Sequence, residues 1–484
     1  VTATDTLDVT ANGAITQNGG DIITVTNAAD FDATGNGITL DQANLFSGAV
    51  SLSGDVVEIN NDQALTLGVV TATDTLDVTA NGAITQNLGD VIEAITSATF
   101  DAQSGINLSA LEATEITADS VAGDIEITNE AVAPTAVNSL TTTGGNIIFT
   151  QNGAGVVTFT TVSTDGAGTL DLSAQAGMSV DGAVTTAGGE IVINADSDGI
   201  ATGTGLFVLA ATGSIDTAGG NLTITGADFD FLAGSSMTVG AGIFDLIFSR
   251  PGSLCLGNAA GCQINLDNTD LQVLTNTTDD LELDNSGNAI LADAADFYTD
   301  DVTLIGSTID NALGVTTIGL TNIGTLTMTA SGNIGGNNAL GVSADTVDVT
   351  EALDVTLFDD GAGATDYTIG SSDTVGAVSI TESTSDLTIT SIDASSNVIL
   401  DAEVASLNIN GNIDAGGTVQ LNGTTAINLG ADVTTTAGNI EFNDAVTVTA
   451  DSQVDTSAGG GNIIFTDTVD GAFDLTLTAG AGAI

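Results

Sequence analysis

The chain lacks most of the residues with which proteins bind anions and transfer protons. It contains no histidine and no tryptophan, and one arginine, Arg250, stands against 63 acidic residues, which gives a formal net charge of −62. Binding of nucleic acid or of an anionic membrane surface needs clusters of Lys and Arg. We therefore exclude nucleic acid as a partner, and the absence of a Gly-Lys-Ser/Thr motif argues against phosphate recognition.

Long apolar runs and helical spacing are also scarce. No apolar run approaches the roughly 18 residues that a membrane-spanning helix needs, so we expect no membrane insertion. The one weak helical candidate is Leu108–Thr117, LSALEATEIT. Prolines are limited to Pro134 and Pro251, whereas there are 60 glycines. Such a composition is typical of a chain that turns every few residues.

A long exact repeat organises the first part of the chain. The stretch from Val1 to Asn18, VTATDTLDVTANGAITQN, recurs unchanged from Val70 to Asn87, at an offset of sixty-nine positions. Since sixty-nine is three times twenty-three, the offset predicts three coils of about 23 residues each, and fixed periods of this size are the signature of repeat architectures.

Glycine-containing turns give a second, independent period. Motifs such as TTTGGN, TTAGGE and TTTAGN each precede the start of an apolar strand. The strand starts Val419 and Ile440 are twenty-one positions apart, and Ile147 and Ile191 are forty-four apart, which is two coils of twenty-two. The longer interval of thirty-one from Ile191 to Leu222 predicts one coil with an inserted loop. Both measures indicate a repeating unit of about 22 or about 23 residues.

A unit of this length fits one rung, that is, one complete coil, of a parallel β-solenoid. Within a rung apolar and polar residues alternate, as in the stretches Leu7–Thr10 and Leu222–Thr225, and period-two alternation indicates strands with one buried face. Each rung buries its apolar face only when the next one stacks on it. The sequence therefore predicts an all-β solenoid.

We expect one continuous solenoid over residues 1–484. Its parts are the double repeat (1–120), rungs with Gly-Gly turns (121–248), a cysteine loop followed by an acidic segment (249–313), and further rungs (314–484). Because the sequence begins and ends within the repeat pattern, we also expect it to be a fragment of a longer protein.

The two cysteines lie in the segment that interrupts the repeats. Cys255 and Cys262 flank the small loop Gly257–Gly261. A disulfide is the favoured interpretation, and it indicates an oxidising, extracellular environment. The alternative is a pair of buried thiols, whereas a zinc site would need more ligands than two thiols supply.

Acidic clusters in turn-like segments are candidates for weak calcium sites, because Ca²⁺ prefers several carboxylate and carbonyl oxygens. Neither cluster has EF-hand spacing. The simpler interpretation is a solvated acidic surface screened by cations. The candidate ligands are Asp359, Asp360 and Asp366 in one cluster, and Asp279, Asp280 and Asp284 in the other.

The segment that begins GSLCLGNAAGCQINLDNTDLQVLTN at Gly252, followed by LELDNSGNAI at Leu281, resembles a segment of filamentous-haemagglutinin-like bacterial surface exoproteins. The phrase GAITQN at Gly82 is also similar to their repeats. The resemblance implies a right-handed parallel β-helix at the cell surface, exported through an outer-membrane partner and used as an adhesin or fibre.

These observations favour a structural or adhesive extracellular fibre that is not an enzyme. β-Helical lyases need Lys or Arg at the reacting centre, and glycoside hydrolases need two carboxylates in one cleft, with aromatic residues to hold the sugar. For the basic residue the chain offers only Arg250, and for sugar-binding Trp or Tyr only Tyr298 and Tyr367. The alternatives are a calcium-dependent surface-array or carbohydrate-binding protein and, less favoured, a polysaccharide-degrading enzyme. Homotypic fibre assembly and a surface receptor are the expected partners.

Overall fold

We describe a computed structural model of the chain, which covers residues 1–200, 205–275, 280–312, 319–336, 338–359 and 365–484. The described chain forms two compact units, Val1–Arg250 (unit 1) and Pro251–Ile484 (unit 2). The boundary falls inside the segment in which the cysteines interrupt the repeats. Each unit is considered by itself, and one uninterrupted solenoid over the whole chain stays a prediction.

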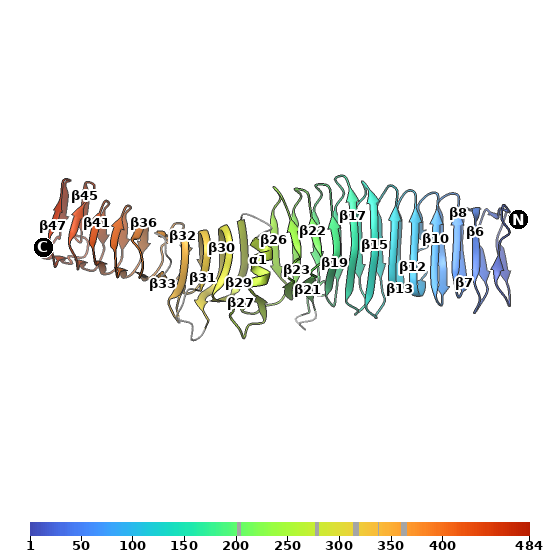
Figure 1. The fold of residues 1–484 in the computed structure, drawn as a ribbon, viewed down its shortest axis with the longest axis horizontal. Coiled ribbons are helices and arrows are strands. Elements are labelled where there is room, and N and C mark those ends of the chain that lie inside the picture. The colour runs from blue at the N-terminus through green and yellow to red at the C-terminus, as the bar shows by residue number, and fades with distance from the viewer. Residues whose placement is uncertain (201–204, 276–279, 313–318, 337, 360–364) are drawn as a thin grey trace. The chain divides into compact units, whose positions relative to one another are not determined.

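The strands of unit 1 are two to fifteen residues long and follow one another closely (blue to green in Figure 1). They are β1 (Thr2–Ala3), β2 (Leu7–Thr10), β3 (Ile15–Thr16), β4 (Thr24–Val25), β5 (Ala29–Asp32), β6 (Ile38–Phe46), β7 (Ala49–Gly54), β8 (Val57–Asn61), β9 (Leu65–Ala72), β10 (Thr75–Ala80), β11 (Ile84–Gln86), β12 (Ile92–Ala102), β13 (Ile106–Ser120), β14 (Ile125–Asn129), β15 (Thr135–Thr143), β16 (Ile147–Gln151), β17 (Val157–Asp165), β18 (Leu170–Ala174), β19 (Met178–Thr185), β20 (Ile191–Asn194), β21 (Leu206–Leu209), β22 (Ser214–Asp216), β23 (Leu222–Gly226), β24 (Asp228–Phe231), β25 (Ser236–Thr238) and β26 (Phe244–Phe248).

Unit 2 contains one helix and a second series of strands. They are β27 (Leu254–Gly257), β28 (Ile264–Leu266), α1 (Asn268–Thr275), β29 (Asp280–Asp293), β30 (Ala295–Asn311), β31 (Leu320–Ala330), β32 (Leu340–Glu351), β33 (Val355–Asp359), β34 (Thr365–Ile369), β35 (Val378–Glu382), β36 (Leu387–Ala394), β37 (Val398–Ala402), β38 (Ser406–Ile409), β39 (Ile413–Ala415), β40 (Val419–Gly423), β41 (Ala426–Leu429), β42 (Val433–Thr435), β43 (Ile440–Phe442), β44 (Val446–Val448), β45 (Ser452–Asp455), β46 (Ile463–Phe465), β47 (Val469–Gly471) and β48 (Leu475–Thr478).

The strands stack in parallel as a β-solenoid of about 21 turns, which confirms the predicted fold class. The predicted periods appear directly in the pairing, since Val419 aligns with Ile440 on the next rung and Leu170 lies between Ile147 and Ile191. Ile191 pairs with Leu222 across the longer interval in the sequence. This pairing confirms one coil with an inserted loop.

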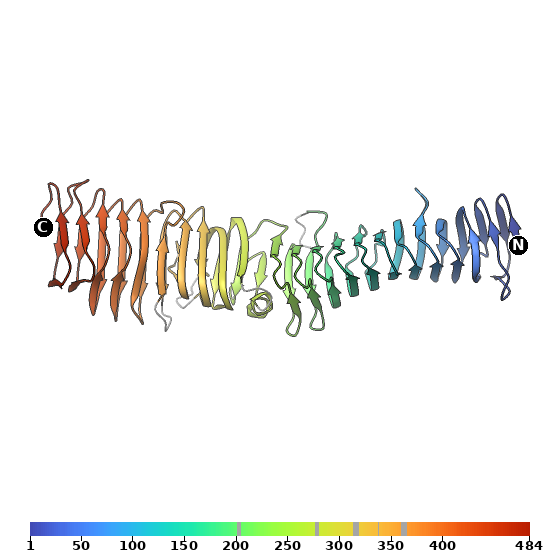
Figure 2. The same cartoon turned by 90° about the horizontal axis from the view of Figure 1, so that it is seen from above.

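Within each unit, equivalent strands of successive rungs lie side by side (Figure 2). Inward-pointing residues alternate with outward ones along the strands, as in Ile147–Gln151, where the first, third and fifth residues are buried. Aligned inward residues form columns of Val, Ile, Leu and Phe. Parallel strands at a spacing of about 4.8 Å therefore build a continuous apolar interior in each unit.

The Gly-Gly turns are explained by a column of closely stacked backbones. A Cβ atom added to Gly189 would lie 1.8 Å from the carbonyl oxygen of Gly168, and one added to Gly220 would lie 2.2 Å from that of Gly189. Real Cβ atoms essentially never approach so closely, so these positions admit only glycine. Buried threonine hydroxyls complete the turns, since Thr186 Oγ1 donates to the Gly189 carbonyl oxygen at 2.7 Å.

The two copies of the exact repeat occupy different positions on the rungs. Leu76 is the repeat equivalent of Leu7, yet it follows Ile15, Ile38 and Val57 in its column. The prediction that the repeat offset makes three whole coils is therefore wrong. The second copy starts one strand position later, because the rungs from Ile38 to Val57 and from Val57 to Leu76 are shorter than the predicted period.

A buried asparagine closes the shortened rung. The side chain of Asn61 accepts a hydrogen bond from the Phe46 amide at 2.8 Å and donates to the Phe46 carbonyl oxygen at 3.2 Å. It thereby occupies the place of the missing strand. A polar residue can lie there, fully buried, because its hydrogen-bonding groups are paired.

The helix of unit 2 is absent from the sequence-based prediction. The weak candidate Leu108–Thr117 lies within strand β13, whereas α1 follows the cysteine loop. Its start has reciprocal capping bonds: Asp267 Oδ1 accepts from the Thr269 amide at 2.7 Å, and Asp270 Oδ2 accepts from the Asp267 amide at 2.8 Å. Asp three residues before Asp, ahead of buried Leu271 and Leu274, is the signal that could have revealed it.

Candidate functional site

The structure separates the acidic residues predicted to bind calcium. Asp279 and Asp360 lie outside the described residues, and of Asp280 only the backbone in β29 is described. Asp284 is exposed on β29. Asp359 is completely buried at the end of β33, whereas Asp366 on β34 is exposed.

Asp359 points into the interior of unit 2, where two hydroxyl groups hold one of its oxygens. Thr365 Oγ1 donates to Asp359 Oδ2 at 2.6 Å, and Tyr367 Oη donates to the same oxygen at 3.0 Å. Thr365 and Tyr367 flank Asp366, whose side chain points to the opposite face of β34. Asp359 and Asp366 therefore lie on different sides of the sheet.

A second buried carboxylate lies beside Asp359. Glu382 aligns with Asp359 in the parallel pair of β33 and β35, and its exposure is 0%. Its Oε1 atom accepts hydrogen bonds from the amides of Thr384 and Ser385, at 2.7 and 2.8 Å, and from the Thr384 hydroxyl at 3.0 Å. Its Oε2 atom has no hydrogen-bond partner among the described residues.

Burial and the neighbouring charge alter the ionisation of this group of residues. Burial, more than the nearby charge of Asp359, raises the pKa of Glu382, although the Thr384 and Ser385 hydrogen bonds oppose the shift. Burial and Asp359 also raise the pKa of Tyr367 well above its ordinary value of 10.0. These shifts reflect the cost of bringing charge into an apolar interior.

The sequence analysis missed Glu382, although the pattern contains the necessary signal. In Val378–Glu382 the first and third residues are apolar and face inward, so the fifth must face inward too. The same holds for Asp359 at the end of Val355–Asp359. An acidic residue at an inward position of a strand is more informative than one in a turn, because burial of a charge needs compensation.

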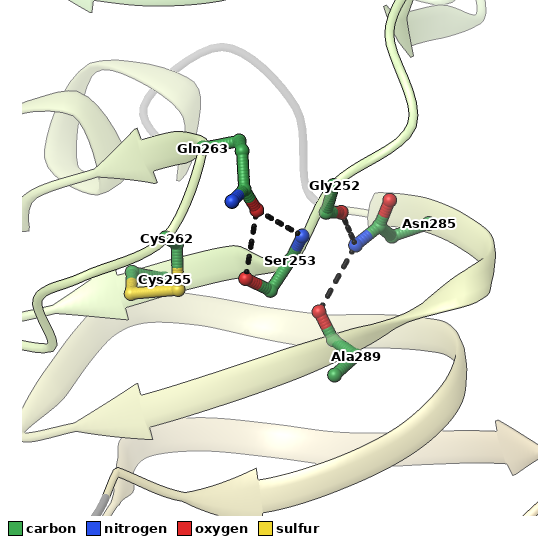
Figure 3. The surroundings of a disulfide bond; sticks show 7 residues. All are labelled: Gly252, Ser253, Cys255, Cys262, Gln263, Asn285 and Ala289. Carbon is green, nitrogen blue, oxygen red and sulfur yellow. Dashed lines mark hydrogen bonds between the residues drawn. A yellow bond between two sulfur atoms is a disulfide. The ribbon is translucent and has the colours of Figure 1, made fainter.

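The cysteine loop forms the disulfide Cys255–Cys262, with the two Cα atoms 5.6 Å apart (Figure 3). It lies between β27 and β28, which pair in parallel with Leu254 opposite Ile264, only ten residues later. Gln263 Oε1 accepts hydrogen bonds from the Ser253 amide and hydroxyl, at 3.0 and 3.1 Å. The disulfide therefore ties a connection that is much shorter than the rungs of about 22 residues.

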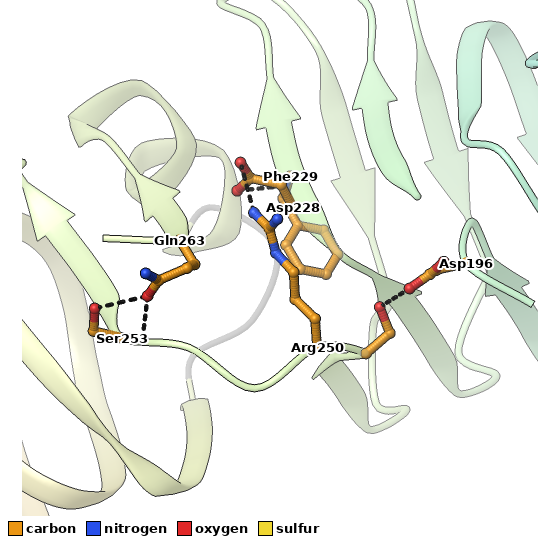
Figure 4. A network of polar contacts seen from close by, with 7 residues as sticks. Asp196, Asp228, Phe229, Arg250, Ser253 and Gln263 are labelled. Atoms are coloured by element: carbon orange, nitrogen blue, oxygen red, sulfur yellow. Dashed lines mark hydrogen bonds and ion pairs between the residues drawn. The ribbon is translucent and has the colours of Figure 1, made fainter. Parts of the chain in front are cut away.

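The single basic side chain is paired within unit 1. Arg250 Nη2 lies 3.7 Å from Asp228 Oδ2 (Figure 4). Nearby, Ser249 Oγ donates to Asp196 Oδ2 at 2.5 Å, and Asp196 is buried. Because Arg250 is already paired with a carboxylate, it offers little to an anionic substrate.

The outer surface has an open hollow of about 240 Å³ near β11, β13 and β14, which polar and apolar residues line. Its polar side chains include Thr85, Asn107, Asp124 and Glu126, and Asn107 Nδ2 donates to Glu126 Oε2 at 2.7 Å. A hollow of this size is smaller than typical ligand pockets. Its acidic lining disfavours anionic ligands.

Two carboxylates on the outer face of unit 1, Asp30 and Asp77, have raised pKa values. Partial burial and the charge of Asp101 raise the pKa of Asp77, and burial with Asp8 and Asp32 raises that of Asp30. Burial is the larger cause for both groups, and the neighbouring like charges add to it. Folding therefore favours the protonated form of these two side chains.

Neither a cluster of metal-binding side chains nor a membrane-spanning helix is found in the described part of the chain. Among the described residues, no group of three or more His, Cys, Asp or Glu side chains is arranged to hold a metal ion. Within the same residues, no helix is long and apolar enough to span a membrane.

Comparison with known proteins identifies a repeat family in the first part of the chain. Residues 1–53 and 54–114 each match the model of a family described as repeats of unknown function (DUF5649). No curated protein and no solved structure matches the chain. The chain is thus a repeat protein. The first matched segment contains Val1–Asn18, and the second contains its exact copy, Val70–Asn87.

Proposed function

We propose that this chain is a structural or adhesive fibre segment at the bacterial cell surface, similar to filamentous-haemagglutinin-like exoproteins, and that it has no catalytic activity. The observation that best supports this proposal is that the described strands pair with equivalent strands of neighbouring rungs. Parallel stacking in each unit buries the apolar columns and leaves outward Thr, Asp, Asn and Ser side chains. Such an arrangement provides length and polar surface.

The composition supports an extracellular location for the fibre. A disulfide is stable outside the reducing cytosol, and Cys255 and Cys262 form one. The chain also contains no lysine, and Arg250 precedes a proline, so it offers trypsin-like proteases no good cleavage site. Export through an outer-membrane partner and assembly of fibres belong to the same proposal.

The arrangement of charged groups supports a non-catalytic role. Arg250 is paired with Asp228, and the buried carboxylates Asp359 and Glu382 have no exposed surface at all. General acid–base catalysis requires groups within reach of a substrate. Neither set of residues meets this requirement.

Two measurements test the proposal. Beads coated with the full chain should attach to epithelial cell monolayers more strongly than albumin-coated beads, and pre-incubation with the free chain should reduce attachment. Incubation with pectin, hyaluronan and xylan should release no unsaturated or reducing products. If chain-coated beads attach no more strongly than albumin-coated beads, the adhesive role is refuted. Release of products from a polysaccharide would show that the chain is an enzyme.

A further inference from the structure

We infer that the buried carboxylates of Asp359 and Glu382 form a binding site for one hard metal cation inside unit 2. This site is independent of the proposed fibre function and differs from the clusters predicted from the sequence. It uses Asp359 with a residue on the next rung, Glu382, rather than with neighbours in the chain.

Both carboxylates point into the interior of unit 2. They follow one another in an inward column, with Val342 on the rung before Asp359 and Ala402 on the rung after Glu382. Both have 0% exposure. Adjacent parallel strands lie about 4.8 Å apart, so the carboxyl groups are within reach of a single ion.

Hydrogen-bond donors fix the orientation of the Asp359 and Glu382 carboxylates. Thr365 and Tyr367 donate to Asp359 Oδ2, and three donors converge on Glu382 Oε1. Carboxylates that bind metals are commonly oriented in this way by hydrogen bonds to a second shell of residues. Glu382 Oε2 remains buried and without a partner among the described residues, and this atom is the one we assign to the ion.

The positive charge that balances these two carboxylates must come from solution, as a metal ion or a proton. Unit 2 begins at Pro251, after the only basic residue, and so contains no Lys, Arg or His. A buried charge that lacks an opposite charge is strongly destabilising, and unit 2 has no basic side chain to pair with either carboxylate. The available ligands are all oxygen atoms, which selects hard cations such as Ca²⁺ over thiolate- or imidazole-seeking metals.

The first experiment compares the melting temperature (Tm) of the full chain in EDTA and in Ca²⁺ at constant ionic strength. We expect Ca²⁺ to raise the Tm of the wild-type chain by several degrees and to have a much smaller effect on Glu382→Gln. Gln keeps the Oε1 acceptor for Thr384 and Ser385 and removes the charge. The matched control is Glu403→Gln, because Glu403 is exposed on the same unit and should leave the response unchanged.

The second experiment does not depend on the folding of a charge variant. Tb³⁺ emits when a nearby tyrosine is excited, and Tyr367 Oη lies 3.0 Å from Asp359 Oδ2. The chain has two tyrosines and no tryptophan, so Tyr367→Phe should remove the emission from this site and leave only that from Tyr298. Ca²⁺ should compete with Tb³⁺ over the concentration range in which it raises the Tm.

Two outcomes would overturn the site. Equal Ca²⁺ shifts in wild type, Glu382→Gln and Glu403→Gln would reduce the effect to screening of surface charge. A Tm that increases in acid but not with Ca²⁺, together with Tb³⁺ emission that Tyr367→Phe leaves unchanged, would mean that a proton neutralises the pair.

Discussion

The side-chain amide of Asn129 forms with Ala113 the two hydrogen bonds that a neighbouring strand would form. Asn129 Oδ1 accepts from the Ala113 amide and Nδ2 donates to the Ala113 carbonyl oxygen, both at 3.0 Å. Asn61 does the same for Phe46 one repeat earlier. The solenoid thus omits a strand without leaving buried backbone groups unpaired.

Substitution of Asn129 should therefore be costly. Asn129→Ala leaves two buried backbone groups of Ala113 without partners, and each such group costs about 1–3 kcal/mol. We expect a loss of about 2–4 kcal/mol in the free energy of unfolding of unit 1, together with faster hydrogen exchange at the Ala113 amide. The control is Asn138→Ala, because Asn138 is exposed on β15; equal losses in both variants would refute the role of Asn129.

The glycine column should tolerate no side chain. In Gly189→Ala the new methyl group would lie 1.8 Å from the Gly168 carbonyl oxygen, so the stacked turns must move apart. Overpacking of this kind typically costs about 1–3 kcal/mol, measurable by chemical denaturation. Gly13→Ala, which meets no atom within 4 Å, should be neutral, and a neutral Gly189→Ala would show that the turns are loosely stacked.

Mild acid should stabilise the chain. The pKa values of Asp30 and Asp77 are raised above their ordinary value of 3.8. A raised folded-state pKa contributes stability that is fully present below the unfolded-state value and is lost as the pH increases through the folded-state value. The Tm should therefore increase as the pH falls from about 7 toward about 4, and Asp77→Asn should reduce this increase.

Stronger acid should reverse that trend at particular turns. Hydrogen bonds from Thr34 lower the pKa of Asp32, and hydrogen bonds from Ser457 lower that of Asp455. Their contributions are present above the ordinary value of 3.8 and disappear as the pH falls through the lowered values. A Tm that keeps increasing well below pH 3.8 would contradict this prediction. A Tm that decreases steadily from neutral pH downward would contradict the preceding one.

Reduction of the disulfide should destabilise unit 2. Cys255 and Cys262 are seven positions apart in the sequence, and the chain-entropy relation gives about 2.5 kcal/mol for a loop of this length. Reductant should lower the denaturation midpoint of the wild-type chain by a corresponding amount. The double variant Cys255→Ser/Cys262→Ser should match the reduced wild type and show no response to reductant; a response there would indicate another cause.

Trypsin should leave the wild-type chain intact even when it is unfolded, because Arg250 is followed by Pro251. Pro251→Ala creates one cleavage site, and that site lies at the boundary of the two units. We expect two fragments on a gel, each with a β-sheet circular dichroism spectrum. A fragment that unfolds after cleavage would show that the unit does not fold by itself.

The period and the alternation of the sequence determined the fold class. The interval from Val419 to Ile440 and the inserted loop before Leu222 both appear in the pairing, because each inward residue must stack on an inward residue of the next rung. The exact repeat led to the wrong prediction of three whole coils, because stacking depends on the number of residues in each rung. Its offset counts residues along the chain, and only the pairing of Ile38, Val57 and Leu76 shows that two rungs have been shortened.

Composition alone supports the expectation that the chain does not bind polyanions, because it has one arginine and no lysine or histidine. Tertiary structure decided which carboxylates meet. Asp359 and Glu382 are distant in the sequence and become neighbours only when β33 and β35 align. The physical reason is that period two fixes the face to which a side chain points, whereas the partner on that face depends on how many residues each rung contains.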